Sequence, residues 1–139
     1  MYTPGKGRGR DHLVTVHIPV NPVPCPRPRL TRGGFVYYPK TYRDYKAAAI
    51  KHVPELDVEW DFPLAVHCDF VVCRPKKPTY DYPSRGDLDN FTKTAWDLIT
   101  TAPGYWKDDR QIVVSTERKR WTKPGEEPHT RIEIYRYKP

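Results

Sequence analysis

The stretch that decides the fold is Gly86-Asp87-Leu88-Asp89-Asn90-Phe91-Thr92-Lys93-Thr94-Ala95-Trp96-Asp97, followed after a loop by Trp106-Lys107-Asp108-Asp109. Two faces emerge when the residues from Asp87 onward are placed at helical spacing. One face is an apolar stripe made of Leu88, Phe91, Ala95, Leu98 and Ile99, and the opposite face carries Asp89, Lys93 and Asp97. This pattern predicts a helix over residues 87–99 that packs its apolar stripe and turns its charged stripe outward.

The same stretch concentrates acidic residues in a basic chain. Residues 87–109 contain five aspartates, whereas the whole chain has 24 Lys and Arg, 17 Asp and Glu, and a formal net charge of +7. Without these five carboxylates, 24 basic residues would face 12 acidic ones, and the net charge would be +12. A basic surface around a local acidic cluster suits a protein that binds a phosphate polyanion and holds a divalent cation against it.

Length and composition limit the class of protein. A chain of 139 residues predicts one domain, and no apolar run approaches the roughly 18 residues of a membrane helix. Residues 1–12 form a basic segment with no apolar stretch behind it, which predicts a flexible tail rather than a secretory signal. We therefore expect a cytoplasmic protein with no membrane partner. Three cysteines without a CxxC pair and five scattered histidines disfavour a disulfide framework and structural zinc.

The remaining elements follow from periodicity and turn residues. Apolar patterns predict strands at residues 13–20, 64–73, 111–121 and 131–137. The last two are expected to pair antiparallel, because only the turn region Lys123–Pro128 separates them.

Two further elements precede the central strand. A second helix is predicted over residues 39–53, with Thr41 as its N-cap. A hairpin is predicted within residues 27–37, turning at Gly33-Gly34.

The spacing of the aspartates indicates how they would work together. Asp87 is expected in the loop that enters the helix and Asp89 at its cap or first turn, so both could share a metal ion near the positive end of the helix dipole. Asp108 and Asp109 are adjacent, so only one is expected to face the same pocket. Clustered carboxylates of this kind suit Mg²⁺. Helix capping or an Asp89–Lys93 ion pair explains any one pair of these charged residues equally well. Neither explains why all the aspartates and the lysine occur together.

The order D-x-D-N, Lys, Asp and then W-x-D-D resembles the RusA family of Holliday-junction resolvases, crossover junction endodeoxyribonucleases common in phages and prophages. The resemblance covers residues 64–121 well, and the upstream Pro- and Arg-rich segment with Phe35-Val36-Tyr37 and the helix predicted after it also resemble phage members of the family. It implies an α+β fold, with a single RusA-like domain over residues 13–139, a mixed β-sheet of about four to five strands and two main helices. It also implies a homodimer in a bacterial or phage-infected host cell.

The resemblance assigns roles to individual residues. It implies that Asp87, Asp89 and Asp109 bind Mg²⁺, for which Mn²⁺ would substitute, and that Lys93 assists catalysis. Asn90, Asp97 and Asp108 fall on positions of a supporting kind. No organic cofactor is expected. Candidate DNA-binding residues, taken from the basic segments of the chain, are Arg27, Arg29, Arg32, Arg74, Lys76, Lys77 and Arg85.

The resulting hypothesis is a Mg²⁺-dependent, structure-selective endonuclease. It would resolve four-way (Holliday) junctions by paired symmetric phosphodiester hydrolysis in DNA recombination and repair. Two alternatives stay open from the sequence. One is a nuclease that acts on other branched DNA, such as forks or flaps, and the other is a non-catalytic junction-binding module.

Overall fold

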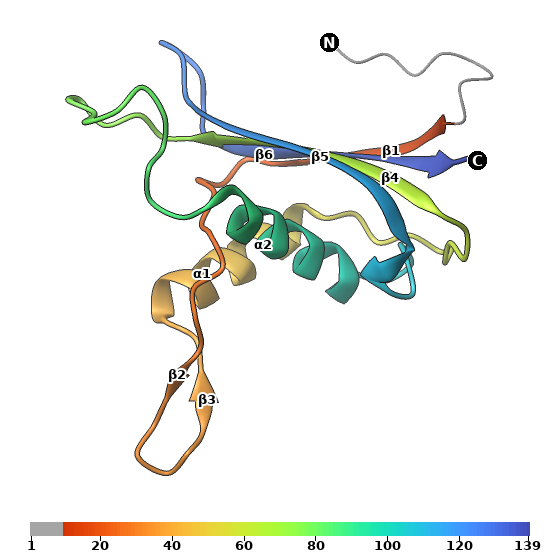
Figure 1. The fold of residues 1–139 in the computed structure, drawn as a ribbon, viewed down its shortest axis with the longest axis horizontal. Coiled ribbons are helices and arrows are strands. Elements are labelled where there is room, and N and C mark those ends of the chain that lie inside the picture. The colour runs from red at the N-terminus through yellow and green to blue at the C-terminus, as the bar shows by residue number, and fades with distance from the viewer. Residues whose placement is uncertain (1–9) are drawn as a thin grey trace.

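The computed structural model describes residues 10–139, which form an α+β fold. Its main sheet has four strands, and helices α1 (Lys40–Ala49) and α2 (Leu88–Thr101) both lie on one face of it (Figure 1). The four strands are β1 (Arg10–Ile18), β4 (Leu64–Val72), β5 (Ile112–Trp121) and β6 (His129–Tyr137). A separate hairpin is made of β2 (Arg29–Leu30) and β3 (Val36–Tyr37). The predicted mixed sheet with two main helices is confirmed.

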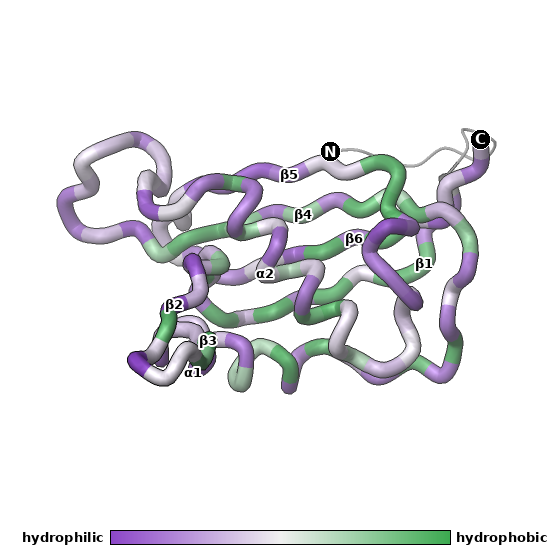
Figure 2. Tube along the Cα trace, turned by 60° about the horizontal axis from the view of Figure 1, so that its bottom comes forward, coloured by the Kyte–Doolittle hydropathy of each residue, from purple (hydrophilic) through white to green (hydrophobic). Residues whose placement is uncertain are grey.

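The strand order is β1-β6-β4-β5, as Figure 2 shows. Strand β6 is antiparallel to both β1 and β4, whereas β5 is parallel to β4. The predicted pairing of residues 111–121 with 131–137 is therefore wrong, because β4 lies between these strands. The chain forms a β4-α2-β5 unit, in which the intervening helix returns β5 in the same direction as β4. Residues 122–128 can then span about 23–25 Å when extended, enough to pass the roughly 10 Å of two strand spacings.

The core lies between the sheet and the two helices. The apolar stripe predicted for the helix at residues 87–99 is buried, with Leu88 partly so, and the ring of Phe91 lies 5.5 Å from that of Phe70 in β4. The sheet contributes alternate residues, as expected for strands with one face on a core. These inward residues include Val16, Ile18, Val66, Cys68, Ile132 and Ile134.

Two predicted boundaries differ from the structure. Strand β1 begins at Arg10, so residues 10–12 of the expected tail are part of the sheet, while residues 1–9 lie outside the described residues. Pairing with β6 explains this extension: the ring of His12 meets Tyr135 edge-on, and Asp11 forms an ion pair with Lys138.

Helix α1 is capped by Pro39 rather than by Thr41, which lies inside the helix. The Pro39 carbonyl accepts hydrogen bonds from the amides of Tyr42 and Arg43. Proline lacks a backbone N–H, but this costs nothing at a helix start, where that group has no partner within the helix. After Ala49 the helix tightens into the 3-10 turn η1 (Ile50–His52) and ends before Pro54. Within residues 10–139, no helix is long and apolar enough to cross a membrane.

The loop after α2 is held tightly against residues 54–60. The Tyr105 hydroxyl donates to the Pro54 carbonyl at 2.6 Å, and the Trp60 amide donates to the Tyr105 carbonyl at 2.8 Å. Gly104 has a φ of +91°, and a Cβ at this position would overlap the carbonyl of Leu56. This loop leads directly to Asp108 and Asp109, so its packing positions them.

We predict that Gly104→Ala destabilises the fold more than Gly125→Ala does. Both glycines have positive φ, which costs other residues roughly 1–2 kcal/mol, but an added Cβ at Gly125 meets no atom within 4 Å. The overlap with Leu56 should at least double the loss at Gly104, to roughly 2–4 kcal/mol. Urea unfolding measures both variants, and equal losses would contradict the tight packing of this loop.

Candidate active site

A pocket of about 760 Å³ lies between α2 and β5. Its charged lining comes from three elements: Asp89, Lys93 and Asp97 belong to α2, Asp109 begins the 3-10 turn η2 (Asp109–Gln111), and Glu117 lies on β5. The remaining lining residues are Leu88, Thr92, Trp96 and Ser115. The charged stripe predicted for the helix therefore faces this pocket, and four of the residues singled out in the sequence meet there.

The start of α2 is fixed from several sides. Gly86 has a φ of +82°, and a Cβ there would overlap Pro24, so the loop before the helix packs directly on that proline. The Lys119 ammonium donates to the Gly86 carbonyl at 3.0 Å, and the Cys25 amide donates to the Asn90 carbonyl at 2.9 Å. These contacts set the position of the first turn, which carries Asp89.

Asp87 is the N-cap residue of α2. Its carbonyl accepts hydrogen bonds from the amides of Asn90 and Phe91, at 3.0 and 3.3 Å. Its side chain is exposed, makes no capping hydrogen bond and does not line the pocket. The structure thus places Asp87 before the helix, as the sequence predicts, but does not bring its carboxylate together with those of Asp89 and Asp109.

Asp108 and Asp109 have different surroundings. The Asp108 carboxylate caps η2 by accepting from the Arg110 amide at 2.9 Å, and this hydrogen bond lowers the pKa of Asp108. Asp109 is half-buried and lines the pocket, where burial raises its pKa, with further increases from Asp108 and Asp97. Of the two neighbours, Asp109 faces the pocket.

Gln111 anchors this turn to the rest of the protein. Its side-chain oxygen accepts from the amides of Lys107 and Asp108, at 2.8 and 3.1 Å. Its side-chain nitrogen donates to the carbonyls of Trp60 and Phe62, at 2.8 and 3.2 Å. The position of Asp109 is therefore set by the loop at residues 54–62 as well as by β5.

The donor set of the pocket fits a hard divalent cation. Mg²⁺ takes one or two carboxylates and completes its shell with water and substrate phosphate. A cation would also relieve the repulsion between Asp97 and Asp109 that contributes to the raised pKa of Asp109. In residues 10–139, no three His, Cys, Asp or Glu side chains are gathered closely enough to enclose a metal ion.

The sequence analysis missed Glu117 and Ser115. Parallel pairing with β4 places Glu117 opposite Cys68 and Ser115 opposite Val66, on the side of the sheet that faces the helices. The Ser115 hydroxyl donates to the Glu117 carboxylate, and burial raises the pKa of Glu117. The signal that could have identified Glu117 is a carboxylate on the side of the strand that faces the helices. Recognising that side requires the register of β5 with β4.

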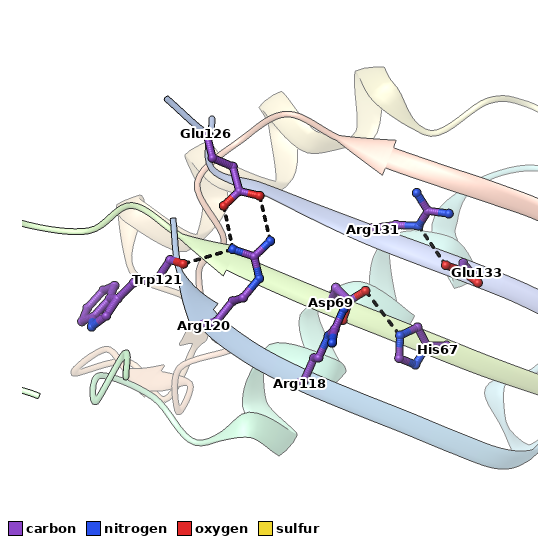
Figure 3. Close-up of polar contacts among 8 residues, drawn as sticks. All are labelled: His67, Asp69, Arg118, Arg120, Trp121, Glu126, Arg131 and Glu133. Carbon is purple, nitrogen blue, oxygen red and sulfur yellow. Dashed lines mark hydrogen bonds and ion pairs between the residues drawn. The ribbon is translucent and has the colours of Figure 1, made fainter. Parts of the chain in front are cut away.

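The other face of the sheet carries a network of ion pairs, shown in Figure 3. Arg118 and His67 both contact Asp69, and Arg131 pairs with Glu133 at 2.8 Å. Arg120 and Glu126 form two hydrogen bonds, at 2.6 and 2.7 Å. The arginines of this face are therefore matched by carboxylates of the same chain.

The candidate DNA-binding cations have different surroundings. All seven are exposed, and none forms an ion pair within 4.0 Å in the part of the chain that the structure describes. Three lie in or beside the β2–β3 hairpin, and four lie in the loop that connects β4 to α2. They are Arg27, Arg29, Arg32, Arg74, Lys76, Lys77 and Arg85.

Comparison with known families agrees with this arrangement. The family model described as endodeoxyribonuclease RusA matches residues 19–135. The chain belongs to the RusA family. RusA Holliday-junction resolvases are metal-dependent endonucleases that cleave branched DNA. The match spans the hairpin, both helices and the pocket, so it includes the upstream segment as well as residues 64–121. A search of curated proteins finds no match.

We predict opposite stability effects at the two adjacent aspartates of this RusA chain. Because the pKa of Asp109 is raised on folding, the folded state loses stability as the pH rises through that pKa. In a chelator at pH 7, Asp109→Asn should unfold at a higher temperature than wild type, and the difference should shrink toward pH 4. Asp108→Ala should unfold at a lower temperature, because it removes the cap of η2. Stabilisation by both variants, or by neither, would contradict this division.

Proposed function

We propose that this chain resolves four-way DNA junctions as a Mg²⁺-dependent homodimer that makes paired, symmetric cuts. The observation that carries the proposal is the pocket that gathers Asp89, Lys93 and Asp97 from α2 with Asp109 from η2. Several carboxylates and one ammonium group face a common space there, beside exposed basic segments. This combination suits hydrolysis of a phosphodiester in a bound polyanion.

In this proposal, Asp87, Asp89 and Asp109 hold the metal. A Mg²⁺ ion held by these carboxylates would supply the Lewis acidity that activates water and stabilises a leaving oxygen. Asp89 and Asp109 approach the pocket from two different elements, which supports a shared ion between them. Asp87 lies just before the first turn, outside the pocket lining, so its variant tests the third ligand separately.

Lys93 is proposed to stabilise negative charge on the phosphate during cleavage. It is exposed, lines the pocket and lies one helical turn from both Asp89 and Asp97. No ion pair within 4.0 Å joins it to either aspartate in the described residues, so its ammonium group can meet substrate. A cation fixed beside the reacting phosphate favours the charge that develops in the transition state.

The supporting residues act through position. The Asn90 carbonyl ties the first turn of α2 to Cys25, and Asp108 caps the turn that presents Asp109. Asp97 shares the pocket and contributes to the raised pKa of Asp109. A two-fold dimer would present two such pockets to strands of like polarity, which paired cutting of a junction requires.

Cleavage mapping tests this function directly. A synthetic four-way junction, a fork, a flap and a duplex, all sharing one arm sequence, are incubated with the protein in Mg²⁺, and products are mapped on every strand. We expect cuts at symmetry-related positions in two opposing strands of the junction. Preferred cutting of the fork or flap would support the other branched-DNA reading, and binding without any cut would support a non-catalytic module.

The same assay tests the metal ligands. Asp89→Asn, Asp109→Asn and Asp87→Asn should each abolish cutting while junction affinity in Ca²⁺ stays near that of wild type, because each removes one ligand but none of the basic surface. Mn²⁺ should replace Mg²⁺, whereas Ca²⁺ should support binding with poor hydrolysis. Normal cutting by Asp109→Asn together with loss of cutting in Asp108→Asn would reverse the assignment of the two neighbours.

We predict that Lys93→Ala lowers the single-turnover cutting rate by about 10²–10³-fold, as expected for the loss of one group that stabilises transition-state charge. Its unfolding temperature should stay near that of wild type, because the side chain is exposed. Lys51→Ala, an exposed lysine of η1 outside the pocket lining, serves as the control and should cut normally. An unchanged rate for Lys93→Ala would contradict the role of this side chain.

A further inference from the structure

The β2–β3 hairpin extends away from the sheet and helices (Figure 1). Its two short strands pair Arg29 with Tyr37 and Leu30 with Val36. The apolar side chains of this hairpin are unusually open to solvent: Leu30 is 70% exposed, Phe35 74% and Val36 62%. These side chains lie outside the core of the described fold, so the hairpin has an exposed apolar surface of the kind that marks an interaction site.

The turn holds Phe35 in a defined place. The Thr31 amide donates to the Phe35 carbonyl at 2.8 Å, and the Phe35 amide donates to the Thr31 hydroxyl at 3.1 Å. Gly34 supplies a φ of +82°, and the Phe35 ring lies so close to Gly33 that a Cβ there would be 3.2 Å from it. The ring is thus positioned by the backbone at the tip of the hairpin while most of its surface stays open.

The charge around this tip is of one sign. No Asp or Glu occurs between Asp11 and Asp44, whereas this stretch contains Arg27, Arg29, Arg32, Lys40 and Arg43. The same hairpin of a second copy carries the same cations and no carboxylate, so it would repel this arm. A nucleic acid can bind both the cations and the exposed Phe35 ring, because its phosphates attract the arginines and its bases stack on an aromatic ring.

The base of the hairpin is attached to the candidate active site. Pro24 packs on Gly86, and the Cys25 amide donates to the Asn90 carbonyl in the first turn of α2. From Cys25, ten residues lead to Phe35, a reach of at most about 33–36 Å. That equals roughly ten base-pair steps of 3.4 Å, so the tip and the pocket can contact one DNA molecule.

We propose that Phe35 is a base-stacking wedge that reads the branch point of the DNA, while Arg29 and Arg32 hold the adjacent phosphates. This inference rests on the proposed function. Inserting an apolar side chain between paired, stacked bases costs a few kcal/mol per step, and this cost is lower where a branch already interrupts the stack. The wedge therefore favours branched over continuous duplex DNA.

The test compares wild type, Phe35→Ala, Phe35→Trp and Val58→Ala, the last being a control at an exposed apolar residue outside the hairpin. Each is titrated in Ca²⁺ against a four-way junction with 2-aminopurine at the branch point, and against a duplex with the same label. Phe35→Ala should lose about 5- to 150-fold in junction affinity, the range for loss of one stacked base, with duplex affinity unchanged. It should also lose the rise in 2-aminopurine emission, which Phe35→Trp and Val58→Ala should keep.

The outcomes separate this inference from the proposed function. If wild type prefers and cuts the junction but Phe35→Ala matches it in affinity and emission, the wedge is overturned and the function stands. If wild type binds junction and duplex equally and cuts neither, both are overturned. If Phe35→Ala instead shifts the protein from dimer to monomer in sedimentation equilibrium, the hairpin contacts a second copy and the wedge is also overturned.

Discussion

The rotation of α2 on the sheet is the constraint on which the candidate active site depends. Phe91, Leu98 and Ile99 are almost fully buried, and burial of side chains of this size is worth about 1.5–3 kcal/mol each. Rotating the helix by half a turn about its axis would expose these three side chains. It would also bury the charged groups of Asp89, Lys93 and Asp97 away from water, which costs free energy. Because the apolar stripe of α2 packs in the core, its charged stripe faces the pocket beside β5. The parallel β4-α2-β5 connection then brings Asp109 and Glu117 to the same space.

A second theme is the division of charge among three surfaces. The pocket gathers carboxylates, and their mutual repulsion contributes to the raised pKa of Asp109. The open face of the sheet pairs its arginines with Asp69, Glu126 and Glu133 (Figure 3). The seven candidate DNA-binding cations lie outside these pairs, in the β4–α2 loop and in or beside the hairpin. The loop leads into the start of α2, and the segment before the hairpin contacts that start through Cys25. The chain therefore places its basic segments next to its acidic pocket, as binding and cutting of a polyanion require.

The sequence predicted what depends on local periodicity and failed where long-range pairing decides. The phase of α2 was predictable because Leu88, Phe91, Ala95, Leu98 and Ile99 recur at helical spacing. The neighbour of β5 was predicted wrongly as the last strand, although a strand, a helix and a strand in succession is the pattern typical of parallel pairing. Without that register, Glu117 could not be placed in the pocket. The separation of Asp87 from the pocket was also beyond reach, because it depends on the direction of one exposed side chain at a helix start.

The most direct test of the account is the position of a bound metal. Crystals grown with Mn²⁺ and measured at its absorption edge would show the ion as an anomalous peak without any DNA present. The account predicts a peak at about 2.0–2.2 Å from carboxylate oxygens of both Asp89 and Asp109, at the mouth of the pocket between α2 and β5. A peak bound by Asp108, or one on the open face of the sheet at Asp69 and Glu133 with none in the pocket, would contradict it.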